Sequence, residues 1–350
     1  MSKDHIVPAQ KTVFLGMSGG VDSSVAAVLL KQQGYRVVGV YMKNWSRDLP
    51  GMKCPWAEDL ADAKRVAVKL GLDFKVFDFE TGYKQKVVDY MLAEFAKGRT
   101  PNPDIMCNQE IKFKLFYETA REQGADLIAT GHYAKTDGEN LLRAFDENKD
   151  QTYFLYRISS EAIKHTLFPI GHLEKPAVKK LAAEHHLDNA YKKESMGVCF
   201  VGEVGMKDFL KTYLPIQPGE IRDADTDATL GFHDGACFYT VGQRHGLNIG
   251  GGLPYYVVGK DVAKNLVFVS KNLEHQNLWV STLELEDIIL RSAIQPDAPL
   301  LVRLRHRAPL ITAKLSGNNL HFENQIKRPA SGQSAVFYQD QICLGGGIIK

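Results

Sequence analysis

The sequence has few cysteines, no long apolar run and almost no net charge. Its five cysteines are odd in number, widely spaced and without a Cys-x-x-Cys pair, so we expect neither a disulfide scaffold nor a protein-held metal. No run of about 18 apolar residues occurs, so no membrane-spanning helix is expected. The 43 Lys and Arg nearly balance the 41 Asp and Glu, leaving +2. A nucleic-acid surface would therefore need local clustering of charge.

The N-terminus likewise lacks the apolar core of a signal peptide. Together with the unpaired cysteines, this predicts a cytoplasmic protein without a membrane partner. A chain of 350 residues is long enough for two or three domains. No dimerisation signature is present, and we expect a monomer.

A glycine- and serine-rich string lies between an apolar run typical of a strand, 12–15, and a run of helical composition, 25–30. The string reads Gly16, Met17, Ser18, Gly19, Gly20, Val21, Asp22, Ser23. Glycines on such a turn let the backbone approach a ligand, and the N–H groups of a helix start bind anions. Asp22 would repel phosphates unless a cation intervenes, which indicates a nucleotide-bound Mg²⁺. A capped helix after a glycine turn is the alternative explanation.

The string lacks the lysine of a Walker loop, and its glycines do not fit the dinucleotide fingerprint. Its Ser-Gly-Gly-x-Asp-Ser core resembles the pyrophosphate-binding loop of the ATP pyrophosphatases. These enzymes split ATP between its α and β phosphates. The resemblance implies ATP as a substrate.

Apolar segments alternate with helical patterns over the N-terminal part of the chain. We expect strands at 12–15, 37–42, 74–79 and 126–130, and helices at 57–70, 83–97, 111–123 and 174–186. This alternation predicts an α/β fold with a doubly wound parallel sheet. Ligands bind beyond the C-terminal strand ends of such sheets. The glycine-rich string, Met42 and Gly131 follow three such ends, so we expect them to surround one nucleotide, with Met42 at the adenine.

Short β-rich segments replace this pattern beyond about residue 202. They include 236–241, 255–258, 266–269, 300–305, 311–315, 335–338 and 342–344. We expect a small β-containing middle domain and a C-terminal β-barrel. The predicted domains are 1–203, 204–275 and 276–350.

Two cysteines lie in sequences that could carry chemistry. Cys107 follows a proline-broken stretch directly before an expected helix, where a helix N-terminus favours the thiolate. Asp104, three residues earlier, is a candidate general acid or base. A buried structural cysteine is the alternative for Cys107. Cys199 is flanked by Val198 and Phe200, and its residue chemistry leaves both alternatives open.

Several strings along the whole chain resemble those of the bacterial tRNA-specific 2-thiouridylases, and they occur in the same order. They are the string 16–23, Asn102-Pro103-Asp104 with Cys107, Gly131-His132-Tyr133, Asp150-Gln151, Gly197-Val198-Cys199-Phe200, Gly332-Gln333-Ser334 and Leu344-Gly345-Gly346-Gly347. The resemblance assigns no role to Cys54, Cys237 or Cys343.

The resemblance implies ATP-dependent 2-thiolation of the wobble uridine of tRNA. ATP adenylylates O2 of the uridine, and pyrophosphate leaves into the glycine-rich string. Cys199 receives sulfur from a donor protein as a persulfide, which attacks C2 or yields hydrosulfide after reduction by Cys107. A Cys107–Cys199 disulfide remains. Asp104 acts as acid or base, while Asn102 and Pro103 help to bind the target base.

Binding of tRNA must expose a stacked anticodon base, so we expect base flipping. Arg303, Arg305 and Arg307 alternate on an expected strand and would share one face. A phosphate contact and a solvated strand face both fit that pattern. By resemblance, the tRNA contacts are His132, Lys149, Asp150, Gln151, His306, Arg307 and Gln333.

Two other functions fit parts of the sequence. One is an ATP-pyrophosphatase ligase or amidotransferase acting on a small molecule, which gives Cys107 and Cys199 no task. The other is a nucleotide-sensing RNA-binding protein without turnover, which leaves both cysteines and Asp104 unexplained.

Overall fold

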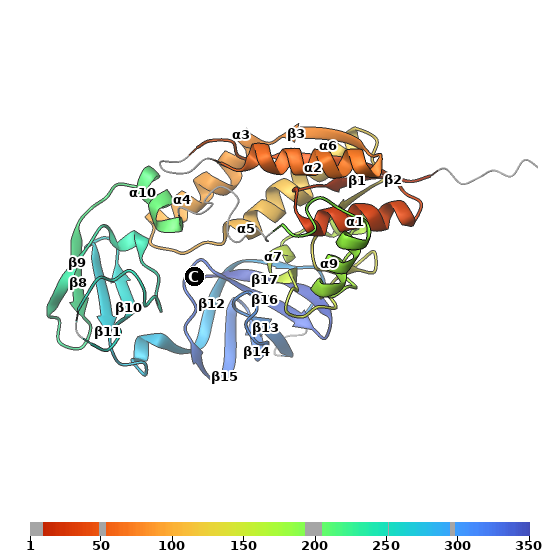
Figure 1. Ribbon diagram of the computed structural model, residues 1–350. Coiled ribbons are helices and arrows are strands. Elements are labelled where there is room, and N and C mark those ends of the chain that lie inside the picture. The colour runs from red at the N-terminus through yellow and green to blue at the C-terminus, as the bar shows by residue number, and fades with distance from the viewer. Residues whose placement is uncertain (1–9, 49–53, 193–204, 251, 295–297) are drawn as a thin grey trace, which may run out of the picture. The chain divides into compact units, whose positions relative to one another are not determined.

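The computed structural model describes residues 10–48, 54–192, 205–250, 252–294 and 298–350 (Figure 1). The chain folds into two compact units. Of the described residues, the first unit holds 10–48, 54–83 and 108–192, and the second holds 84–107 and those from 205 onward. None of the described helices is both long and apolar enough to cross a membrane.

A parallel sheet of five strands forms the centre of the first unit, in the order β3-β2-β1-β4-β7. The strands are β1 (Thr12–Gly16), β2 (Arg36–Lys43), β3 (Asp73–Asp78), β4 (Leu127–Thr130) and β7 (Thr166–Leu167). This confirms the predicted doubly wound sheet. The order reverses between β1 and β4, which is where such folds bind their ligands.

Both faces of the sheet are covered, which explains why the residues of β1 from Val13 to Leu15 are all apolar. Val13 and Leu15 share a core with α1 (Val21–Gln32), α2 (Trp56–Leu70) and α9 (Lys175–Glu184). Phe14 points to the opposite face. Its ring packs at a tilt against Phe77, and the Phe77 ring packs at a tilt against Phe116 of α6 (Phe116–Glu122). Figure 1 shows α1 beside α9. The remaining elements of the unit are α3 (Glu80–Tyr83), β5 (Lys135–Thr136), β6 (Leu141–Leu142), α7 (Thr152–Leu155) and α8 (Ser160–Lys164).

Two predicted helices differ from the observed ones. The segment 83–97 contains the π-helical η1 (Lys84–Val88) and α4 (Asp89–Ala96). The helix expected at 111–123 begins earlier, with α5 (Pro103–Met106) and the π-helical η2 (Cys107–Leu115) ahead of α6. The reason is local, since Asn102 caps the Asp104 N–H and Pro103 occupies the first helical position.

The middle part of the second unit is a four-stranded sheet in the order β10-β11-β8-β9. Its elements are α10 (Met206–Tyr213), β8 (Gly219–Asp223), β9 (Thr229–His233), β10 (Tyr256–Asp261) and β11 (Leu266–Ser270). The strand predicted at 236–241 is wrong. Ala236–Phe238 forms the 3₁₀ turn η3, in which Ala236 and Phe238 are buried without strand pairing.

The C-terminal part is an antiparallel barrel, as predicted. Its order is β12-β15-β14-β13-β16-β17, and pairing of β12 with β17 closes it. The short η4 (Gln276–Leu278) precedes β12 (Trp279–Leu290), β13 (Pro299–Arg303), β14 (Ile311–Ser316), β15 (Asn319–Lys327), β16 (Ser334–Gln339) and β17 (Ile342–Ile349). Leu285, Val302 and Phe337 lie in its core.

The predicted arginine face on this barrel is wrong. β13 ends at Arg303. This residue is 5% exposed, so its side chain does not face solvent. Arg305 and Arg307 lie beyond the strand, where Ala308 N–H donates to Arg305 O and Arg307 has a φ of 63°. A chain that turns there loses the two-residue alternation on which the prediction rested.

Candidate functional site

The glycine-rich string forms the turn from β1 into α1, as predicted. Gly19 has a φ of 75°, a conformation that favours glycine. Gly20 is the N-cap of α1, and as a glycine it has no side chain that could cap the helix. Its carbonyl instead accepts hydrogen bonds from Ser23 Oγ at 3.1 Å and from Ser24 Oγ at 2.9 Å. We call residues 16–24 the phosphate loop.

Three strand ends meet at this loop. The Cε atom of Met42 lies 2.9 Å from where a Cβ on Gly16 would stand. A Cβ on Gly131 would come within 2.6 Å of Ser23 N, so glycine is required for this close approach. The predicted gathering of the loop, Met42 and Gly131 is therefore present, and their binding of a nucleotide remains a prediction.

Asp22 has a cation of its own. Its Oδ1 accepts hydrogen bonds from Lys175 Nζ at 2.7 Å and from Tyr133 OH at 3.0 Å. Lys175 is 7% exposed, whereas the Asp22 side chain is 31% exposed, so the cation is the buried partner of this pair. Gln151 orients Tyr133, because its N–H donates to Tyr133 O and its Oε1 accepts from Tyr133 N–H. Sequence reasoning missed Lys175, which lies 153 positions from Asp22.

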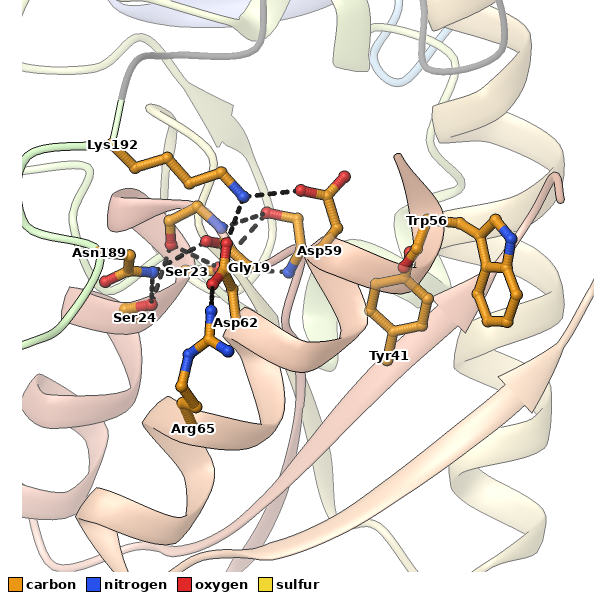
Figure 2. A network of polar contacts seen from close by, with 12 residues as sticks. Gly19, Ser23, Ser24, Tyr41, Trp56, Asp59, Asp62, Arg65, Asn189 and Lys192 are labelled. Atoms are coloured by element: carbon orange, nitrogen blue, oxygen red, sulfur yellow. Dashed lines mark hydrogen bonds and ion pairs between the residues drawn. The ribbon is translucent and has the colours of Figure 1, made fainter. Parts of the chain in front are cut away.

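A second set of polar contacts holds the loop from another side (Figure 2). Asn189 Nδ2 donates to Gly19 O and to Ser24 Oγ, each at 2.9 Å. Lys192 Nζ pairs with Asp59 Oδ1 at 2.8 Å and with Asp62. Burial alone would lower the pKa of Lys192, but hydrogen bonds and charge from the two carboxylates outweigh it and raise that pKa. Sequence reasoning missed these residues too.

Of the two candidate catalytic cysteines, the structure describes Cys107 alone. Cys107 is buried, 4% exposed, and its N–H donates to Asp104 O. It was expected in a loop directly before a helix, but it lies in the second turn after the Asn102 cap, and helix-terminus effects fade beyond the first turn. Cys199 falls outside the described residues. The roles of Cys107, Cys199, Asp104, Asn102 and Pro103 stay predictions.

The segment before Cys107 is held by distant parts of the second unit. Thr100 N–H donates to Ser331 O at 2.7 Å, and Gln333 Nε2 donates to Thr100 O at 2.7 Å. Arg99 pairs with Glu94 at 2.7 Å and with Glu286 of β12 at 2.5 Å. The predicted tRNA residue Gln333 thus contacts the chain close to the predicted catalytic segment.

Other predicted tRNA residues have structural contacts within the first unit. His132 is buried, its Nδ1 lies 2.8 Å from Thr130 Oγ1, and burial together with Lys112 holds its pKa well below 6.5. Buried Asp150 accepts from Ala144 N–H and from Thr152 Oγ1. Lys149 N–H donates to Asp146 O. In the second unit, His306 and Arg307 follow β13. Their contacts with tRNA stay predictions.

The remaining described cysteines have no predicted role. Burial raises the pKa of the Cys54 and Cys237 thiols. Cys343 is buried in β17. Among the described residues, no group of three or more His, Cys, Asp or Glu side chains could hold a metal ion.

The parallel sheet, with the phosphate loop between β1 and α1, has the fold of the ATP-pyrophosphatase class. Family models match three consecutive parts of the chain: the tRNA methyl transferase HUP domain over 11–203, the tRNA methyl transferase PRC-barrel domain over 207–271, and the aminomethyltransferase beta-barrel domain over 282–349.

Relatives match nearly the whole chain. The tRNA-specific 2-thiouridylase MnmA of Idiomarina loihiensis is 48% identical, covering 98% of this chain and 96% of its own. MnmA 2 of Geobacillus kaustophilus is 46% identical over 98% and 95%, and MnmA of Pectobacterium carotovorum is 47% identical over 98% of both chains. The chain belongs to the tRNA-specific 2-thiouridylase family.

Proposed function

We propose that this protein catalyses ATP-dependent 2-thiolation of the wobble uridine of tRNA. The observation that carries the proposal is the end-to-end identity of 46–48% with tRNA-specific 2-thiouridylases. Further support comes from the phosphate loop at three strand ends and from Cys107 beside Asp104 on one helical segment. The domains we propose are 1–203 for ATP, 204–275 as a central domain and 276–350 for tRNA.

Adenylylation is the first proposed step. Uridine O2 attacks the α phosphorus of ATP, the α–β phosphoanhydride bond breaks, and pyrophosphate is released to the phosphate loop. Mg²⁺ would accompany the nucleotide and offset the phosphate charge. Asp22 is already balanced by Lys175, so it does not by itself oppose a phosphate. Asp104 is the proposed acid or base at the uridine.

Sulfur transfer is the second step. The persulfide sulfur on Cys199 attacks C2, and AMP leaves with the former O2. The Cys107 thiolate then attacks the Cys199 sulfur, which frees 2-thiouridine and leaves a Cys107–Cys199 disulfide. In the other route, Cys107 first releases hydrosulfide, which attacks C2. Either route needs a persulfide donor protein to load Cys199 and a reductant to reopen the disulfide. We propose that a monomer performs both steps.

The test is nucleoside analysis after incubation of the purified protein with ATP, a tRNA that carries uridine at the wobble position, and a sulfide or persulfide donor. We expect 2-thiouridine, AMP and pyrophosphate in equal amounts, and none with a tRNA that carries cytidine at the wobble position. Absence of 2-thiouridine with every donor would refute the proposal. Pyrophosphate release without tRNA would favour the small-molecule ligase, and binding without turnover would favour the sensor.

The family descriptions also mention methyl transfer. The same nucleoside analysis, repeated with a methyl-group donor in the mixture, distinguishes the two outcomes, because replacement of oxygen by sulfur and addition of a methyl group give different masses. A methylated uridine as the sole product would contradict thiolation.

A further inference from the structure

The amide of Asn189 sets the direction of one peptide unit in the phosphate loop. Its Nδ2 donates to Gly19 O at 2.9 Å. The carbonyl and N–H of one trans peptide point in opposite directions. Because Asn189 holds the Gly19 carbonyl on its own side, the N–H of Gly20 points away from Asn189. Within the part of the chain that the structure describes, the contact of that N–H is a long one, 3.4 Å to Ser18 Oγ, which leaves it able to bind an anion.

Asn189 also acts on the next carbonyl through Ser24. Its Nδ2 donates to Ser24 Oγ, and Ser24 Oγ donates to Gly20 O, each at 2.9 Å. Two successive carbonyl oxygens of the loop are thus engaged in internal hydrogen bonds. A phosphate oxygen near them would otherwise meet the negative ends of these carbonyl dipoles. The contacts keep acceptors occupied and a donor available.

Asn189 is buried, and its amide has one favourable orientation. The residue is 5% exposed, and its Oδ1 is buried without a hydrogen-bond partner among the described residues. The opposite amide orientation would place Oδ1 against Gly19 O, and two acceptors cannot bond. The hydrogen-bond network therefore assigns Nδ2 to the loop.

A neighbouring ion pair ties the same segment to α2. Lys192, three positions after Asn189, bridges Asp59 and Asp62. α2 itself lies against the loop, because a Cβ on Gly19 would come within 2.4 Å of Asp59 O. Figure 2 shows Asn189 and Lys192 reaching the loop and the start of α2 together.

We infer that Asn189 is a positioning residue of the pyrophosphate site. It orients the Gly19–Gly20 peptide so that the Gly20 N–H donates to the β and γ phosphates of ATP. The inference rests on the proposed function, since it takes ATP as the ligand. AMP has no β or γ phosphate, so its affinity does not depend on this peptide.

The experiment measures dissociation constants of ATP, pyrophosphate and AMP for the full chain and for Asn189→Ala. Loss of one well-directed hydrogen bond to a charged group predicts about tenfold weaker binding of ATP and pyrophosphate, and AMP binding within about twofold. Unchanged ATP and pyrophosphate affinity would overturn the inference. An equal loss for AMP would also overturn it, because it would reveal a general structural defect.

Further variants separate orientation from packing. Asn189→Asp keeps the shape but removes the donor, and we expect it to lose at least as much pyrophosphate affinity as Asn189→Ala. Wild-type affinity in Asn189→Asp would contradict the inference. Ser24→Ala keeps the Asn189 bond to Gly19 O and removes the two bonds of Ser24 Oγ, one from Asn189 Nδ2 and one to Gly20 O. A smaller loss in the same direction is therefore expected even if Asn189→Ala does not fold. Ser24→Ala with unchanged pyrophosphate affinity would count against the inference. Asn318→Ala, in the exposed turn between β14 and β15, is the matched control.

The outcomes distinguish this inference from the proposed function. If the wild-type protein binds ATP and pyrophosphate but forms no 2-thiouridine, the proposed function fails while the role of Asn189 can still be measured. If thiolation occurs and Asn189→Ala leaves pyrophosphate affinity unchanged, only the inference fails.

Discussion

The phosphate loop and the segment 98–107 are both short, and both are predicted to take part in the reaction. The contacts that hold them in place differ in kind. The loop is fixed by buried side chains, chiefly Asn189 and Lys175. The segment 98–107 is fixed by backbone bonds of Thr100 and by Arg99. Arg99 pairs with buried Glu94 and with Glu286, whose side chain is 38% exposed. Buried contacts are weakly screened by salt, whereas exposed ion pairs are screened. Salt should therefore weaken the Arg99–Glu286 contact more than the contacts of Asn189 and Lys175 with the loop.

The largest expected effect belongs to the cysteines. Cys107→Ser and Cys199→Ser should each abolish thiolation, because neither hydroxyl can carry persulfide sulfur or form the disulfide. ATP affinity should be unchanged if the two regions act separately. Nucleoside analysis and ATP binding measure this, with Cys54→Ser as a control. Normal turnover in either variant would remove that cysteine from the mechanism.

Lys175→Ala tests how strongly buried contacts stabilise the phosphate loop, and it has the second-largest expected effect. It leaves Asp22 without its buried cation and should lower the free energy of unfolding by about 2 kcal/mol. Urea denaturation measures the loss. Lys180→Ala on the same helix α9 is the matched control, because Lys180 is exposed and pairs only at the surface with Glu184; we expect a change below about 0.5 kcal/mol there. Equal stabilities of the two variants would contradict a special role for Lys175.

Gln333→Ala tests the cysteine side of the comparison with a smaller effect. Loss of its bond to Thr100 O should lower the kcat of thiolation by about fivefold, which corresponds to one hydrogen bond. A residue that only contacts tRNA would instead raise KM for tRNA at constant kcat. Steady-state kinetics separates the two results, and exposed Gln341→Ala, in the β16–β17 turn, serves as the control.

The smallest effect is expected from Glu286, and it depends on pH. The hydrogen bond from Arg99 lowers the pKa of Glu286 below 4.5. A lowered folded-state pKa stabilises the protein above the unfolded-state pKa, and this contribution disappears as pH falls through the lower, folded-state value. Glu286→Gln should cost less than about 1 kcal/mol at neutral pH, because the pair is partly exposed. Its stability deficit should vanish toward acid pH and shrink in high salt; a deficit independent of both would exclude the ion pair.

Much of the fold could be predicted because it depends on local patterns. Apolar runs gave β1 and β2 their expected places, and the spacing around Leu60 and Ala67 predicted α2. The errors have local causes as well. The apolar segment after Gly235 forms a turn, β13 ends at Arg303, and the Asn102 cap starts a helix before Cys107. In each case a turn or cap overrode the periodicity.

The sequence alone determined the phosphate loop and its family, because a strand, a glycine turn and a helix start are encoded by adjacent residues. Only the tertiary structure decided which side chains hold that loop. Asn189 and Lys175 reach it from 170 and 153 positions away, and no periodicity connects such pairs. The same holds for Gln333 and Thr100, which are 233 positions apart. Hydrogen bonds require proximity in space, and chain folding alone supplies that proximity.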